Sequence, residues 1–136
     1  MKILRIIFVL VTLLIITSCS NSEFLNNDVV DSGTITNTAT NSSITLTKDE
    51  AESIIESLNK QLTRTKDIYK LDLHIQIVLC DADKKELYKI YTSTLESYSG
   101  SEPQVGINGK TYNISKDFFE TLDTIYKKYN FDLNFD

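Results

Sequence analysis

The only histidine of the chain, His74, lies in a stretch where Asp72 and Gln76 alternate with it. If this stretch is a β-strand, the three side chains share one face. An aspartate beside a histidine can transfer protons or bind a metal ion. Side chains two positions apart on a strand are not in automatic hydrogen-bond contact, and no second histidine or cysteine pair completes a zinc site. We therefore interpret His74 as part of a solvated strand face.

Two neighbouring groups also carry reactive residue types. Cys80 needs a nearby cation or helix terminus to become a reactive thiolate, and the adjacent Asp81 acts in the opposite sense. Asp81 and Asp83 have the spacing of the first ligands of a calcium loop, but Glu86 stands where such a loop needs glycine. We interpret Cys80 as a buried strand residue, and we predict no catalytic, cofactor-binding or metal-binding residue in the chain.

The start of the chain carries a third reactive group, Cys19. Lys2 and Arg5 precede an apolar run of 11 residues, 6–16, which only Thr12 interrupts. This run suits the apolar core of a signal peptide and is too short to span a bilayer. Ile16-Thr17-Ser18-Cys19 follows directly, and the pattern resembles the lipobox of bacterial lipoproteins. One alternative is an ordinary secretory signal in which the cysteine is accidental. The other is a transmembrane helix, against which the polar residues 18–22 argue because they end the apolar run abruptly.

The lipobox resemblance implies that residues 1–18 are a signal peptide and that Cys19 is the lipid attachment site. Cys19 would become the N-terminus, carrying a thioether-linked diacylglycerol, and the chain would lie on the extracytoplasmic side of the cell envelope. Two or more acyl chains anchor a protein stably. Ser20 stands where an aspartate would resemble an inner-membrane retention signal. The resemblance therefore favours the outer membrane in a source with two membranes.

The chain without its first 18 residues is acidic, with 12 basic and 19 acidic residues and a net charge of −7. This charge argues against a nucleic-acid partner, whose phosphates require a basic surface. It also argues against adsorption of the protein surface to anionic lipid. With Cys19 carrying lipid, Cys80 has no partner for a disulfide.

Residues 20–46 are rich in polar residues, since 15 of these 27 are Ser, Thr or Asn. Such a composition buries too little apolar surface to offset its ordering entropy. We therefore expect residues 19–46, lipidated Cys19 included, to form a disordered tether. Within it, Thr34-Ile35-Thr36 alternates weakly and could pair as a strand with a partner.

Residues 47–136 are expected to form a single α+β domain. Thr47 and Glu50 have the spacing of a capping box, and a helical stripe follows. The stripe comprises Ala51, Ile54, Ile55, Leu58 and Leu62. Residues 71–80 alternate as a strand, with Leu71, Leu73, Ile75, Ile77 and Leu79 facing the core.

The middle of the domain is ambiguous. Residues 81–86 are either a polar turn before a strand, 86–94, or a second capping box that opens a helix ended by Gly100. The β-branched and aromatic residues favour the strand. Residues 97–104 are expected to form a surface loop. Asn108-Gly109 then predicts a tight hairpin, because both turn positions need positive φ.

The end of the domain predicts a second helix. Ser115 has the position of its N-cap, and a broad apolar stripe follows at helical spacing. The stripe comprises Phe118, Phe119, Leu122, Ile125, Tyr126 and Tyr129. We expect it to face the core, the alternative being an exposed patch at the two tyrosines. Residues 131–136 alternate again and are either a short strand or a frayed tail.

These elements predict a small antiparallel β-sheet with an N-terminal and a C-terminal helix packed on one face. The expected function is that of a membrane-anchored envelope lipoprotein with a non-catalytic binding, adaptor or inhibitor module. Its expected partners are the membrane, through Cys19, and a protein of the envelope, with no cofactor. The alternatives are a structural subunit, whose tail or tether adds a strand to a neighbour, and a carboxylate-based hydrolase, for which so small a domain leaves little room.

Overall fold

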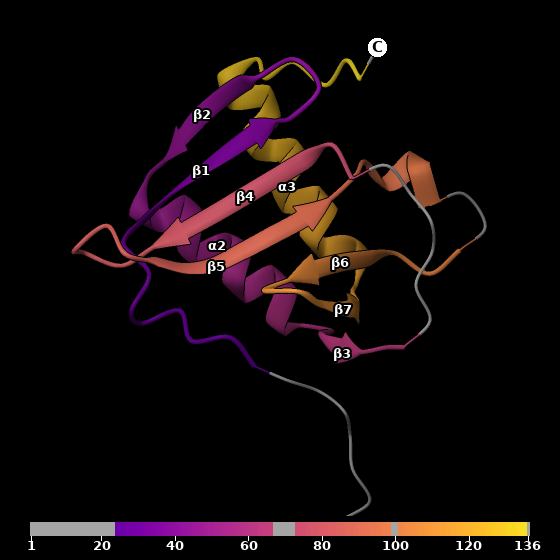
Figure 1. The fold of residues 1–136 in the computed structure, drawn as a ribbon, viewed down its shortest axis with the longest axis horizontal. Coiled ribbons are helices and arrows are strands. Elements are labelled where there is room, and N and C mark those ends of the chain that lie inside the picture. Colours follow the sequence, from indigo (N-terminus) through magenta and orange to yellow (C-terminus); the bar gives the residue numbers. More distant parts are fainter. Residues whose placement is uncertain (1–23, 67–72, 99–100, 136) are drawn as a thin grey trace, which may run out of the picture.

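The computed structural model describes residues 24–66, 73–98 and 101–135. Within these residues seven antiparallel strands form one sheet in the order β2-β1-β4-β5-β6-β7-β3. Helices α2 and α3 pack together on one face of the sheet (Figure 1). The predicted α+β class is therefore confirmed. The elements are β1 (Ser32–Asn37), β2 (Ser42–Leu46), α2 (Lys48–Asn59), β3 (Thr63–Arg64), β4 (Ile75–Cys80), β5 (Glu86–Thr92), the short 3-10 helix η1 (Leu95–Tyr98), β6 (Gln104–Ile107), β7 (Lys110–Asn113) and α3 (Lys116–Tyr129).

The core lies between the sheet and the two helices. On β4, Ile75, Ile77 and Leu79 are buried, whereas the residues between them are half-buried on the opposite face. This alternation follows from the two-residue period of a strand. The helices contribute the two apolar stripes expected from the sequence, and the residues of these stripes that lie within α2 and α3 are buried, except Tyr129, which is half-buried.

The prediction of a disordered tether over residues 19–46 is wrong for residues 32–46. These residues form β1 and β2, and β1 lies inside the sheet, paired to both β2 and β4. Gly33, Ile35 and Leu46 are buried on the helix-covered face. The few apolar residues of these two strands occur at alternating positions, so they face the core. The serines and threonines between them, except Ser42 opposite the buried Asn37, face outward. The weak strand at Thr34 to Thr36 therefore pairs within its own sheet.

The segment before β1 is also held by the domain. The backbone N–H of Leu25 donates to Asn59 Oδ1 at 2.8 Å, and Asn59 Nδ2 donates back to the Leu25 carbonyl oxygen at 2.8 Å. The N–H of Asn26 donates to the hydroxyl of Tyr88 at 3.0 Å, and Val30 is buried. The segment from Leu25 onward therefore belongs to the packed domain, which its composition placed only from Thr47.

The central hairpin settles the ambiguous middle of the sequence in favour of the strand. Residues 86–92 form β5, which pairs with β4 and, through Ile90 and Tyr91, with β6. The predicted strand 71–80 begins only at Ile75, and Leu73 is 38% exposed rather than inward-facing. Leu71 and Asp72 lie outside the described residues.

The local signals for the starts of both helices are found at the predicted positions. Thr47 and Glu50 form the predicted capping box at the start of α2. Ser115 is the N-cap residue of α3, as predicted, with extended backbone. Its side chain makes no capping hydrogen bond, however, and its hydroxyl oxygen is buried without a partner among the described residues.

The predicted hairpin turn is present between β6 and β7. Asn108 and Gly109 have φ values of 48° and 80°, the left-handed pair that a two-residue hairpin turn requires. The side chain of Asn108 also accepts from the Lys89 N–H and donates to the Leu87 carbonyl oxygen, at 2.8 and 3.1 Å. The turn is thereby fixed to β5 as well as to its own strands.

The C-terminal segment is neither of the two forms considered. Residues 131–135 have no strand pairing, yet Asn37, fully buried at the end of β1, donates from Nδ2 to the carbonyl oxygens of Asp132 and Asn134 at 3.0 and 2.7 Å. Phe131 is buried, and Leu133 and Phe135 pack against the core. The alternating residues do face inward, but a side-chain amide holds the segment in place of a β-ladder.

A candidate binding cleft

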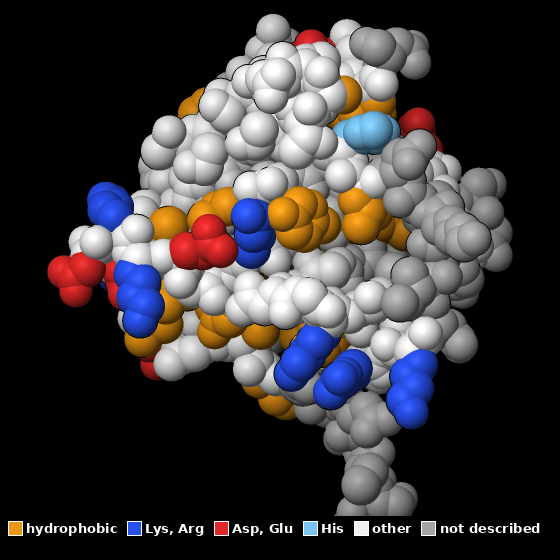
Figure 2. Space-filling view, viewed as in Figure 1, with side chains coloured by type: hydrophobic (Ala, Val, Ile, Leu, Met, Phe, Trp, Pro, Cys, Tyr) orange, Lys and Arg blue, Asp and Glu red, His pale blue; other side chains and the backbone are white. Residues whose placement is uncertain are grey.

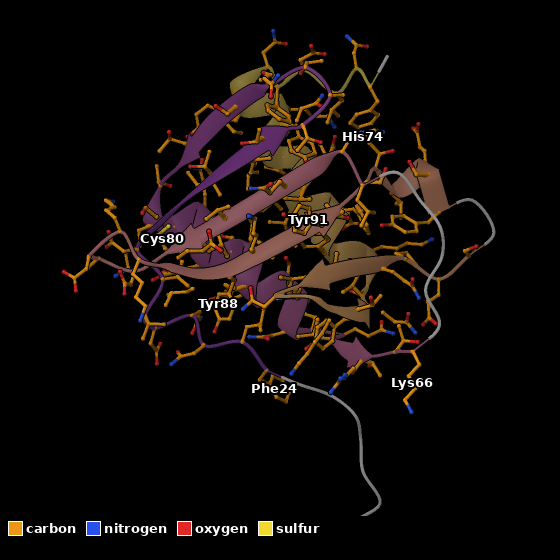
Figure 3. All side chains as sticks on the ribbon, in the orientation of Figure 1. Phe24, Lys66, His74, Cys80, Tyr88 and Tyr91 are labelled. Carbon is orange, nitrogen blue, oxygen red and sulfur yellow. The ribbon has the colours of Figure 1, made fainter. Side chains whose placement is uncertain are left out.

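The residues that carry reactive types do not gather at one place. His74 lies just before β4, at the same end of the molecule as the C-terminal segment, and its ring stacks on Phe135 with the ring centroids 5.1 Å apart (Figure 3). Gln76 is on the sheet face that the helices leave open. Asp72, the residue considered as a partner of His74, lies outside the described residues, and so does Cys19, the predicted lipid attachment site. The structure thus gives His74 a packing contact.

Cys80 and the acidic turn that follows it are also used structurally. Cys80 is a free thiol at the end of β4, half-buried rather than buried, opposite Ser32 and Glu86. Asp81 Oδ1 accepts from the N–H groups of Asp83 and Lys85, both at 2.9 Å. These bonds shape the turn between β4 and β5. No group of three or more histidine, cysteine or acidic residues among the described residues could hold a metal ion.

A cleft of about 540 Å³ lies where three segments that are distant in the sequence meet. Its volume falls within the range of ligand pockets, about 300–1,000 Å³. One wall is α3, a second is the end of β5 with η1, and the third is the C-terminal segment. The lining residues are Ser93, Thr94, Leu95, Glu96, Phe119, Glu120, Leu122, Asp123, Tyr126, Leu133 and Phe135.

The base of the cleft is apolar because it continues the hydrophobic core. Phe119 and Leu122 lie on the inward stripe of α3 and are almost fully buried. Leu133 and Phe135 come from the C-terminal segment that Asn37 holds in place. Leu95, 37% exposed, adds an apolar side chain to the open side. An apolar group that enters the cleft therefore finds apolar surface on every wall.

The rim of the cleft is acidic. Glu96, Glu120 and Asp123 are exposed lining residues, and no lysine or arginine is among the residues that line the cleft. Asp123 pairs with Lys127 at 2.5 Å. Glu96 and Glu120 make no ion pair with a described residue. The rim thus favours a positively charged group on whatever occupies the cleft.

Tyr126 is the one lining residue with an unusual polar atom. Its side chain is 8% exposed, and its hydroxyl oxygen is buried without a hydrogen-bond partner among the described residues. Burial raises the pKa of the Tyr126 phenol, so the group is neutral at physiological pH. Leaving a buried hydroxyl unpaired costs about 1–3 kcal/mol. A ligand group that reached this hydroxyl would gain a bond that the protein alone does not make.

No pattern in the sequence pointed directly to this cleft. Phe119, Leu122 and Tyr126 were expected to be core residues, which describes their burial but not the open space beside them. The C-terminal alternation was the one available indication, because it placed Leu133 and Phe135 on an inward-facing side.

Comparison of the chain with models of protein families, with curated proteins and with solved structures finds no match. Among the described residues, neither helix has the length and apolarity needed to cross a bilayer.

Proposed function

We propose that this chain is a membrane-anchored lipoprotein of the cell envelope, and that its domain is a non-catalytic binding module. The anchor rests on the lipobox-like residues 16–19 and implies acylation of Cys19. The binding function rests on one observation, the apolar cleft with its rim of carboxylates. The ligand that fits is a segment of a protein partner in which an apolar side chain lies beside a lysine or arginine.

The position of the carboxylates favours binding over hydrolysis. A general acid needs a carboxyl group that is removed from water, so that it stays protonated near neutral pH. Glu96, Glu120 and Asp123 are all exposed at the rim, and the buried base of the cleft is formed by leucine and aromatic side chains. This arrangement attracts a cation and shelters an apolar group, without a desolvated acid.

The anchor is tested on protein extracted from membranes. Mass spectrometry of the N-terminal peptide should show Cys19 as the first residue with diacylglycerol attached, and Cys19→Ala should move the chain from the membrane to the soluble fraction. An unmodified N-terminal peptide that begins at Met1 would refute the anchor.

The cleft is tested by photo-crosslinking in cells of the source. A crosslinking amino acid at Leu95, on the open side of the cleft, should capture a partner, whereas the same group at exposed Thr40 on the β1–β2 turn should not. The double variant Glu96→Gln/Glu120→Gln should reduce capture several-fold, and the control Glu56→Gln/Glu86→Gln should leave it unchanged. Equal capture from both positions, or by both double variants, would refute the binding site.

One observation favours a second candidate function, that of a structural subunit. β2 is the outermost strand of the sheet and, among the described residues, pairs only with β1. Its five residues include no charged residue and no proline, the features that commonly block strand addition. Thr45→Lys on this exposed edge should abolish an assembly built by strand addition, which size-exclusion chromatography of membrane extracts would show.

A further inference from the structure

Three cationic side chains gather at the edge of the sheet formed by β3 and β7. They are Arg64, Lys66 and Lys110, all exposed, and we call them the basic edge. Arg64 lies opposite Tyr112, and the N–H of Thr65 donates to the carbonyl oxygen of Thr111 at 3.0 Å. These pairings bring the residues beside Thr65 close to the start of β7.

The basic edge stands out because three unpaired charges lie close together. Five other described lysines, Lys48, Lys60, Lys84, Lys127 and Lys128, form ion pairs with acidic side chains. Arg64, Lys66 and Lys110 form none with a described residue. The same is true of Lys85, Lys89 and Lys116, so it is the clustering of the three charges that distinguishes the edge. Figure 2 shows blue side chains along this lower edge with no red side chain between them. The adjoining residues 67–72, outside the described part, include two acidic and one basic residue, so an excess of positive charge remains.

The first described residues of the chain lie at the same edge. Leu25 is bound to Asn59, which precedes β3 by four residues. Phe24 is 76% exposed, and both Phe24 and Lys66 project from the lower edge of the molecule (Figure 3). An exposed phenylalanine on the same side of a protein as unpaired cations is a combination found on surfaces that lie on a membrane interface.

The distance from the predicted anchor is short. Phe24 follows Cys19 by five residues, and a fully extended chain spans at most about 3.5 Å per residue, or about 17 Å in all. Because this reach is about twice the electrostatic screening length at physiological salt, the domain is held close to the charged surface of the bilayer. A 27-residue tether would have let the domain move freely, but β1 and β2 take most of that length into the sheet.

We propose that the basic edge and Phe24 rest on the anionic lipid headgroups of the bilayer that holds Cys19. The proposal depends on the acylation of Cys19 proposed above. Tethering makes the contact intramolecular, so a few weak charge contacts suffice. The net charge of −7 does not oppose this orientation, because the positive charge is concentrated at the edge from which the tether leaves. η1 and the C-terminal segment, which form two walls of the cleft, then lie away from the bilayer (Figure 1).

Lysine footprinting tests the orientation on the acylated protein reconstituted into vesicles. Acetylation of Lys66 and Lys110 should fall about 3-fold or more in vesicles with 30% phosphatidylglycerol relative to pure phosphatidylcholine, and high salt should restore it. Lys48 and Lys85, exposed on α2 and on the β4–β5 turn, serve as internal controls whose acetylation should stay constant. Equal acetylation of Lys66 and Lys110 in both vesicle types would overturn the proposal.

Two variants and a chemically attached lipid distinguish failure of this proposal from failure of the proposed acylation of Cys19. The first variant is Arg64→Gln/Lys66→Gln/Lys110→Gln, and the measured quantity is the extent to which a soluble oxidant modifies Phe24. In this variant, oxidation of Phe24 on anionic vesicles should rise to the level seen on neutral vesicles. The second variant, Lys48→Gln/Lys84→Gln/Lys85→Gln, should not show this rise. If Cys19 proves unacylated, a chain that begins at Cys19 and carries Cys80→Ser is coupled through the Cys19 thiol to a maleimide lipid. The acetylation of Lys66 and Lys110 is then measured on the same two vesicle types. Protection by soluble polyphosphate but not by anionic vesicles would identify a polyanion as the ligand and overturn the membrane contact.

Discussion

At the scale of single residues, the domain depends on side chains whose role the composition does not reveal. Asn37 is buried and uses its amide to hold the C-terminal segment, which forms one wall of the cleft. Tyr126 lines the same cleft with a hydroxyl that has no hydrogen-bond partner in the part of the chain that the structure describes. Buried polar groups are normally hydrogen-bonded, so this hydroxyl is a candidate for a hydrogen bond to the ligand proposed above.

Tyr126→Phe tests this interpretation. Removing an unpaired buried hydroxyl should leave the free energy of unfolding unchanged or raise it by about 1 kcal/mol, while crosslinking of a partner at Leu95 declines. Tyr98→Phe is the matched control, because the Tyr98 hydroxyl donates to the Gln104 carbonyl oxygen at 2.6 Å and its loss should cost about 1 kcal/mol or more. Urea unfolding measures both. A loss for Tyr126→Phe as large as that for Tyr98→Phe would contradict the orphan assignment.

Gly33 tests the placement of β1 inside the sheet. A Cβ at this position would lie 2.7 Å from Leu79 Cδ2 and 2.8 Å from the Val78 carbonyl oxygen. Gly33→Ala should therefore destabilise the domain by about 1–3 kcal/mol through overpacking. Gly106→Ala, whose Cβ would meet nothing closer than 3.8 Å, should change the free energy of unfolding little. Equal urea midpoints for the two variants would argue that β1 does not pack as described.

At the scale of elements, one carboxylate joins the start of α2 to the end of α3. Glu50 completes the capping box of α2, pairs with Lys128 and accepts from the Tyr129 hydroxyl at 3.1 Å. Desolvation acts to raise the pKa of Glu50, but the hydrogen bonds from Lys128, Thr47 and Tyr129 outweigh it and lower the pKa. The two helices are thereby linked at the ends where their dipoles favour these charges.

The sign of this shift predicts a pH dependence. A carboxyl group whose pKa is lower in the folded state stabilises the fold above its unfolded pKa, and this stability is lost as the pH falls through the folded pKa. The free energy of unfolding should thus decline below about pH 4.5. Glu50→Gln should be less stable at pH 7 and should show a smaller decline on acidification. Glu52→Gln, which loses only a distant pair with Lys48 at 3.8 Å, should follow the wild type. Parallel curves for wild type and Glu50→Gln would contradict this role.

At the scale of the whole molecule, the domain includes β1 and β2, which its hydrophobic pattern did not indicate. Few residues of the sequence therefore separate the domain from its predicted anchor. β1 occupies the second position of the sheet, between β2 and β4, so it is not an optional edge. If the basic edge lies on the bilayer, the cleft faces the space beyond it, where a partner can approach.

Two truncations test this domain boundary. A chain of residues 24–136 should unfold cooperatively with a midpoint close to that of the chain beginning at Cys19. A chain of residues 47–136 loses β1 and β2, which leaves one edge of β4 unpaired and removes Ile35 and Leu46 from the core. It should fail to fold, as circular dichroism and thermal unfolding would show. Cooperative unfolding of the 47–136 chain would restore the original prediction that residues up to 46 are only a tether.

The sequence alone determined the features that depend on neighbours along the chain. The capping box at Thr47, the helical stripes, the alternation of β4 and the Asn108-Gly109 turn all rest on contacts within a few residues, so each pattern predicted its element. The choice of a strand for β5 was right for the same reason, because β-branched and aromatic side chains favour extended backbone.

Only the tertiary structure decided what depends on distant partners. The serine- and threonine-rich residues 32–46 lack the apolar content of an independent strand pair, but they fold because β4 and the helices supply the surface that Gly33, Ile35 and Leu46 need. The C-terminal segment is fixed by an amide nearly a hundred residues away, and the cleft exists only where that segment meets α3 and η1. Burial is shared between segments that meet only in the fold, so no local pattern could indicate where the domain begins or where its cleft lies.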